Sequence, residues 1–147
     1  MSRRLARETA LQVLFQVDMT GDNIDMAATV NKWAQEFAVP DMSIPFAQEL
    51  VEGSLLHKNE IDKKIASLAQ GWSIDRMATV DRNLLRLATY EVLYCLDIPG
   101  KVTLNEAVEL AKRYGGSDSA KFINGILDKM LEGSGKRKIV DSGEKKL

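Results

Sequence analysis

VDRNLLRLATYEVLYCL, residues 80–96, decides the fold class of this chain. Its apolar residues recur with a helical period and cover so much of the circumference that neighbouring elements must surround the helix. The segment is therefore predicted to be the central helix of the core. We expect Leu84, Leu87 and Ala88 to be almost fully buried there, together with Leu127 from further along the chain.

The rest of the chain has the same helical period, and no alternating run of apolar and polar residues bounded by hairpin turns occurs. An all-α fold of about seven helices follows. On the first helix, one face is expected to be apolar and buried, and it is formed by Ala6, Ala10, Val13, Leu14 and Val17. The predicted helices cover, in order, residues 3–19, 26–38, 44–56, 60–71, 80–96, 104–115 and 117–133.

Helix starts are predicted from polar side chains that can accept a hydrogen bond from the first free N–H groups. For the sixth helix, Thr103 and Glu106 have the spacing of a capping box. The other predicted caps are Asp25, Ser43, Asn59 and Thr79.

Composition excludes several classes of protein. Apolar residues make up 45% of the 147, which is enough for a sizeable core. No apolar run approaches the ~20 residues that span a bilayer, and the start of the chain does not have the pattern of a secretion signal, so no membrane association is expected. One cysteine, Cys95, and one histidine, His57, form neither a disulfide nor a cysteine/histidine zinc cluster, which fits a reducing cytoplasm.

The net charge of −1 conceals an uneven distribution. Residues 11–57 carry Lys32 against seven acidic residues, whereas residues 1–10 and 129–147 are basic. Basic ends on an acidic chain indicate two kinds of partner surface.

Catalytic patterns are poorly represented. Residues 115–117 (GGS) lack the preceding strand and the following lysine of a phosphate-binding loop. His57 has no serine or cysteine that spacing would nominate as a nucleophile, and Cys95 lies in the most apolar helix. We therefore expect no enzymatic activity, no cofactor and no metal.

The first helix contains a candidate binding edge. At about 100° per residue, Arg3, Arg4 and Arg7 lie within one arc, and Leu11 and Phe15 continue its line. Guanidinium groups beside an aromatic ring suit RNA, because they bind phosphates or stack on unpaired bases. The alternative is that the arginines are solvated and Phe15 packs in the core.

A second candidate lies between the last two helices, at residues 115–122 (GGSDSAKF). Two glycines permit close backbone approach, and the free N–H groups of a helix start with Lys121 suit a phosphate. Asp118 repels an anion, so a plain capped turn is the alternative. Phe122 is either a stacking ring or a core residue.

Four blocks of sequence resemble one known family. They are residues 3–12 (RRLARETALQ), 81–91 (DRNLLRLATYE), 98–112 (IPGKVTLNEAVELAK) and 121–128 (KFINGILD). In order and spacing they are similar to the NusB family of bacterial transcription antitermination factors. Leu5 interrupts a run of arginines that is longer in some members.

The resemblance implies two small helical bundles packed against each other, at residues 1–57 and 58–132. The remainder, residues 133–147, is rich in glycine, serine and lysine and is expected from this composition to be a mobile basic tail. The resemblance also implies a non-catalytic protein that pairs with the small-subunit ribosomal protein NusE. The pair binds boxA, a short single-stranded segment of nascent RNA, and through it acts on the RNA polymerase elongation complex.

Carried over by position, the resemblance assigns two sets of residues. The RNA-binding residues would be Arg3, Arg4, Arg7, Gln12, Ser117, Asp118, Lys121 and Phe122. The partner-binding residues would be Asp75, Arg76, Asp81 and Arg82.

Two other functions stay open. A helical protein–protein adaptor without RNA affinity would explain the acidic residues 11–57. The same fold also occurs as the N-terminal domain of certain RNA cytosine methyltransferases, but this chain has no room for their catalytic domain. The oligomeric state is open as well, because some family members form homodimers that cover the RNA surface and others are monomers.

Overall fold

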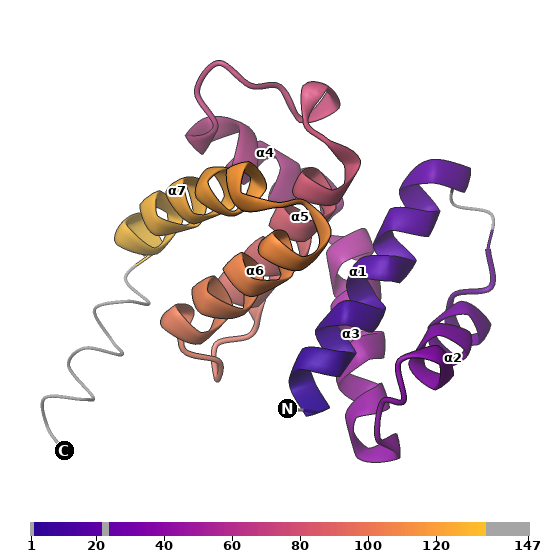
Figure 1. Ribbon diagram of the computed structural model, residues 1–147. Coiled ribbons are helices and arrows are strands. Elements are labelled where there is room, and N and C mark those ends of the chain that lie inside the picture. Colours follow the sequence, from indigo (N-terminus) through magenta and orange to yellow (C-terminus); the bar gives the residue numbers. More distant parts are fainter. Residues whose placement is uncertain (1, 22–23, 135–147) are drawn as a thin grey trace, which may run out of the picture. The chain divides into compact units, whose positions relative to one another are not determined.

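The chain folds into α-helices. The computed structural model describes residues 2–21 and 24–134, and in these ranges it contains seven α-helices, two single-turn 3-10 helices and no strand (Figure 1). The predicted all-α class with about seven helices is confirmed. None of the helices in the described ranges is long and apolar enough to cross a membrane. The predicted mobile tail lies outside the described residues except for Gly133 and Ser134, which belong to the last helix.

The chain divides into two units, one within residues 1–58 and the other from residue 59 on. The first contains α1 (Ser2–Thr20), α2 (Met26–Glu36), a 3-10 turn (Asp41–Ser43) and α3 (Ile44–Leu56). After His57, α4 (Lys58–Leu68) leads into the second unit, which contains a 3-10 turn (Ile74–Arg76), α5 (Thr79–Tyr94), α6 (Gly100–Tyr114) and α7 (Ser117–Ser134).

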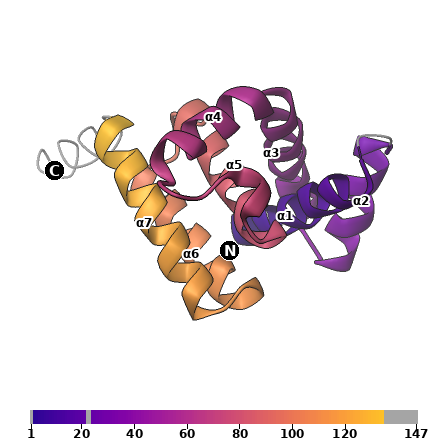
Figure 2. The same ribbon diagram turned by 90° about the horizontal axis from the view of Figure 1, so that it is seen from above.

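In the first unit, α1 packs against both α2 and α3 (Figures 1 and 2). The predicted apolar face of α1 is confirmed, because its members are at most 5% exposed: Ala6, Ala10, Val13, Leu14 and Val17. A polar link joins α1 to α2, where the indole N–H of Trp33 donates to the side-chain oxygen of Gln16 over 3.0 Å. The apolar face of α1 and this hydrogen bond both contribute to holding the unit together.

In the second unit, α5 is the central helix, as predicted, and it packs against α6 and α7 (Figure 1). Every residue of α5 from Asn83 to Val92 is buried. Leu84, Leu87, Ala88 and Leu127 are at most 2% exposed, which confirms the expected core.

Two charged side chains of α5 are buried with the apolar ones, and both have partners. The Arg86 guanidinium binds the Asp62 carboxylate of α4 through two hydrogen bonds of 2.9 and 3.1 Å. The Glu91 carboxylate, 1% exposed, accepts a hydrogen bond of 2.9 Å from the Thr103 hydroxyl of α6. A buried charge is costly unless it is paired, so these contacts fix the positions of α4 and α6 on α5.

Predicted helix caps were correct in one case. The Asp25 side chain accepts a hydrogen bond from the Ala28 N–H over 3.1 Å, as expected. Ser43 occupies the cap position of α3, but its side chain makes no capping hydrogen bond. Asn59 and Thr79 lie inside α4 and α5, so their predicted capping roles are wrong.

The predicted capping box of α6 is also wrong. The helix begins at Gly100, four residues earlier than predicted, with Pro99 at its cap position. Thr103 lies inside the helix, and its hydroxyl is used by Glu91 of the neighbouring helix. Gly100 allows α7 to pack closely against this helix start, because a Cβ atom there would lie 2.5 Å from the end of the Leu131 side chain.

Candidate functional site

The basic edge predicted on the first helix is formed by residues of different exposure. Arg3 and Arg4 are exposed, Gln12 is half-buried, and Arg7 is only 4% exposed. Two members of this group therefore offer their charge to solvent, while Arg7 lies mostly below the surface.

An aromatic ring of α3 lies under these arginines. The guanidinium carbon of Arg3 is 4.6 Å from the centroid of the Phe46 ring, and that of Arg7 is 5.5 Å from it. Both are within the ~6 Å over which a cation is attracted to a ring face. The sequence analysis did not predict Phe46 as a site residue, because no spacing rule connects it to residues 3 and 7.

The second predicted group lies in the first turns of α7. Ser117, Asp118 and Lys121 are exposed and Phe122 is half-buried. The Phe122 ring meets the ring of Trp72 edge to face, with centroids 5.9 Å apart. Trp72, itself 53% exposed, was not predicted as a site residue.

The predicted anion site relies on the first N–H groups of α7, whereas the N–H groups of the two glycines before that helix are bonded within the turn. The N–H groups of Gly115 and Gly116 both donate to the Ala111 carbonyl, over 2.8 and 2.9 Å. They close the end of α6 and are not directed at a ligand. Gly116 has a φ of +97°, which favours glycine and explains its place in the turn.

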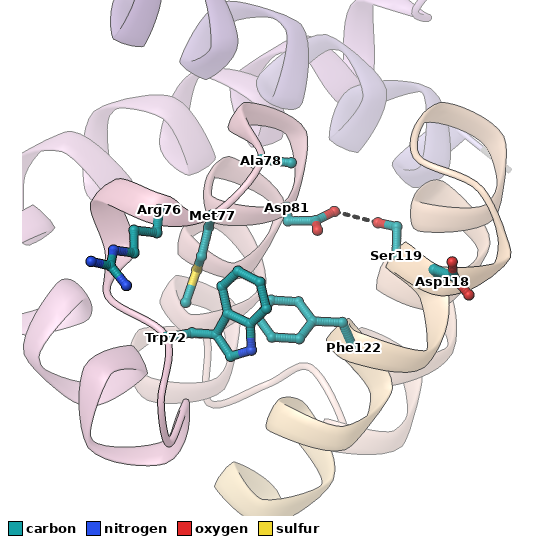
Figure 3. A pocket seen from close by; sticks show the side chains of 8 residues that line it. All are labelled: Trp72, Arg76, Met77, Ala78, Asp81, Asp118, Ser119 and Phe122. Carbon is teal, nitrogen blue, oxygen red and sulfur yellow. Dashed lines mark hydrogen bonds between the residues drawn. The ribbon is translucent and has the colours of Figure 1, made fainter.

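A cavity of about 490 Å³ opens beside the Trp72–Phe122 pair in the second unit (Figure 3). Its wall is apolar around the rings and polar at the edge, and it is lined by Trp72, Arg76, Met77, Ala78, Asp81, Asp118, Ser119 and Phe122. The volume suits one side chain or one nucleobase of a partner.

The cavity brings together residues that the sequence assigned to two different surfaces. Arg76 and Asp81 come from the predicted partner set, whereas Asp118 and Phe122 come from the predicted RNA set. Asp81 accepts a hydrogen bond from the buried Ser119 hydroxyl, which ties the start of α5 to the start of α7 (Figure 3).

Some predicted residues lie away from this cavity wall. Asp75 is exposed on the 3-10 turn Ile74–Arg76, and Arg82 is half-buried on α5. Ser117 and Lys121 are exposed on α7 without lining the cavity. The arginines of α1 belong to the first unit and the α7 residues to the second.

Groups that could bind a metal ion do not form a cluster in the described ranges. No set of three or more histidine, cysteine, aspartate or glutamate side chains is placed there to hold a metal ion. Cys95 is buried with an exposed fraction of 4%.

Comparison with known proteins gives one consistent result. The model of the NusB family matches residues 4–132. The transcription antitermination protein NusB of Desulfitobacterium hafniense (strain DSM 10664 / DCB-2) is 64% identical over 137 residues, which cover 93% of this chain and 93% of the relative.

Two solved structures are similar in fold and sequence. T. maritima NusB superposes with a TM-score of 0.81 at 37% identity, covering 89% of this chain and 91% of that chain. The crystal structure of the antitermination factors NusB and NusE in complex with double-stranded RNA has a TM-score of 0.79 at 29% identity, covering 89% of this chain and 96% of that one.

Proposed function

The chain belongs to the NusB family of transcription antitermination proteins, and we propose that it acts by binding RNA of the boxA type together with the ribosomal protein NusE. The observation that carries the proposal is the similarity, over 89% of the chain, to a NusB that was crystallised with NusE and RNA. The two candidate surfaces described above supply suitable chemistry for such a role.

On the first unit, the arginines of α1 are the proposed phosphate-binding groups. Arg3 and Arg4 are exposed, and a guanidinium group binds phosphate oxygens with two parallel hydrogen bonds. Gln12 lies on the same helix and adds an amide. Phosphate contacts of this kind give affinity without base specificity.

On the second unit, the start of α7 is the proposed base-contacting region. Phe122 and Trp72 provide half-buried and exposed ring surface, and Lys121 adds a positive charge. Splayed RNA bases stack on such rings, at a gain of about 1–3 kcal/mol per base. Ser117 and Asp118 flank this surface and can hydrogen-bond base edges.

The proposed NusE side lies at the start of α5 and the turn before it. Asp75 and Arg76 are exposed, and with Asp81 and Arg82 they form a mixed-charge surface. Opposite charges close together favour a protein partner with a complementary pattern over a phosphate chain. Because Arg76 and Asp81 line the same cavity as Phe122, NusE and RNA would bind next to each other on this unit.

The test is a titration of labelled boxA-type RNA with the chain alone and with added NusE, at two salt concentrations. We expect affinity to rise when NusE is present. Scrambled single-stranded RNA and double-stranded RNA serve as competitors, since they report sequence and strand preference separately.

The control variant is Lys63→Ala, which removes an exposed base on α4 that pairs only loosely with Glu60 at 3.9 Å. It should leave RNA affinity unchanged, whereas Arg3→Ala should lower it. An absence of RNA binding with and without NusE would favour the alternative function, a protein–protein adaptor that uses the acidic residues 11–57.

A further inference from the structure

We infer that Phe46 is a positioning residue of the RNA surface on α1, which holds the guanidinium groups of Arg3 and Arg7 in one place. The inference rests on the proposed RNA-binding function. Phe46 itself need not contact RNA, and its role is to act through the two arginines.

Two guanidinium groups lie close to the Phe46 ring. Arg3 and Arg7 stand one helical turn apart on α1, and their guanidinium carbons lie 4.6 and 5.5 Å from the ring centroid. The ring comes from the first turn of α3, directly after Pro45, and α3 packs against α1. The contact is thus made between two elements whose packing is fixed by the core of the first unit.

The Phe46 ring counteracts a charge repulsion within α1. Like charges four residues apart on a helix repel each other. The negative face of an aromatic ring attracts both guanidinium groups. Phe46 therefore offsets the repulsion and limits the number of arginine conformers.

Contact with the ring leaves the arginines able to bind an anion. A guanidinium group has five N–H donors spread around its plane, so a group held over one ring keeps donors for a phosphate. Arg3 is exposed, so its edge is open to a phosphate, while Arg7 is 4% exposed and anchors the inner side of the pair. A preordered arginine loses less conformational entropy on binding, which raises affinity without a new contact to RNA.

The experiment compares Phe46→Leu, which removes the ring, with Phe46→Tyr, which retains it. Both are titrated with labelled boxA-type RNA in the presence of NusE, and thermal stability is measured on the same samples. We expect Phe46→Leu to bind about three- to tenfold more weakly and Phe46→Tyr to restore binding. Phe46→Met, which fills a similar volume without a ring, replaces Phe46→Leu if that variant does not fold.

The matched control is Phe37→Leu in the same unit. The Phe37 ring lies against Trp33, with centroids 6.1 Å apart. We expect this variant to lose stability as Phe46→Leu does, yet to keep wild-type affinity for RNA. Equal losses of affinity in the two variants would mean that Phe46 acts only through the stability of the unit.

A second comparison tests whether Phe46 acts through the arginines. In an Arg3→Ala/Arg7→Ala background, adding Phe46→Leu should cause almost no further loss of affinity. The inference is overturned if Phe46→Leu weakens binding by the same factor with and without the two arginines, or if it leaves the wild-type affinity unchanged. A wild-type chain that binds no RNA, with or without NusE, would overturn the proposed function and this inference together.

Discussion

Leu87 shows at the scale of one residue how strongly the core depends on a single side chain. It is 1% exposed on the central helix α5. Replacing it by alanine removes buried methyl groups and leaves a cavity, so Leu87→Ala should lower the free energy of unfolding by about 2–5 kcal/mol. Urea denaturation measures this loss. The control is Leu96→Ala, at a site that is 81% exposed, which should lower the free energy of unfolding only slightly. A loss below ~1 kcal/mol for Leu87→Ala would show that α5 is not central.

Substitution of Phe122 distinguishes a role of its ring in stacking on an RNA base from a role in the core. Its ring is half-buried against Trp72, so Phe122→Ala removes less core than a fully buried phenylalanine would. If a base stacks there, we expect RNA affinity to fall by about 1–3 kcal/mol while the slope of log affinity against log salt is unchanged. Affinity and thermal stability are measured on one sample. A stability loss of about 3–5 kcal/mol, with RNA binding reduced only in proportion to the fraction of unfolded protein, would show that Phe122 is a core residue.

Sequence patterns predicted the residues that face the core better than those that form the sites. The apolar face of α1 and the burial of α5 follow from helical period, because that period depends only on local spacing. Thr103 was misplaced because its hydroxyl is used by Glu91 on another helix. Phe46 and Trp72 were missed as site residues for the same reason, since their partners lie far away in sequence.

At the scale of elements, the pairing of α5 with α6 depends on the hydrogen bond between Glu91 and Thr103. Thr103→Val keeps the shape of the side chain but removes the donor from a carboxylate that is 1% exposed. We expect a loss of about 1–3 kcal/mol in the free energy of unfolding, as is usual for a hydrogen bond to a buried charge. Thr20→Val is the control, because the Thr20 hydroxyl bonds the Gln16 carbonyl at an exposed site. Similar losses of unfolding free energy in the two variants would mean that the hydrogen bond between Glu91 and Thr103 contributes no more to stability than an exposed one.

At the scale of the whole molecule, charge limits what this chain can do without a partner. Its net charge is −1, and the proposed RNA surface of α1 contributes three arginines. Each phosphate contact to single-stranded RNA changes the slope of log affinity against log salt by about 0.7, so three contacts give a slope of about −2 at most. So few phosphate contacts supply little electrostatic affinity, which is the physical reason to expect that NusE is needed.

The prediction is that the salt slope for boxA-type RNA becomes steeper when NusE is added, because a second protein brings further phosphate contacts to the same strand. Arg3→Ala should reduce the slope by up to ~0.7 both with and without NusE, since the contact it removes belongs to this chain. Fluorescence titrations over a series of salt concentrations give one slope for each variant and measure both effects. A slope for the chain alone that equals the slope of the mixture would mean that this chain supplies all the phosphate contacts, and the dependence on NusE would then have to come from base contacts such as those proposed for Phe122.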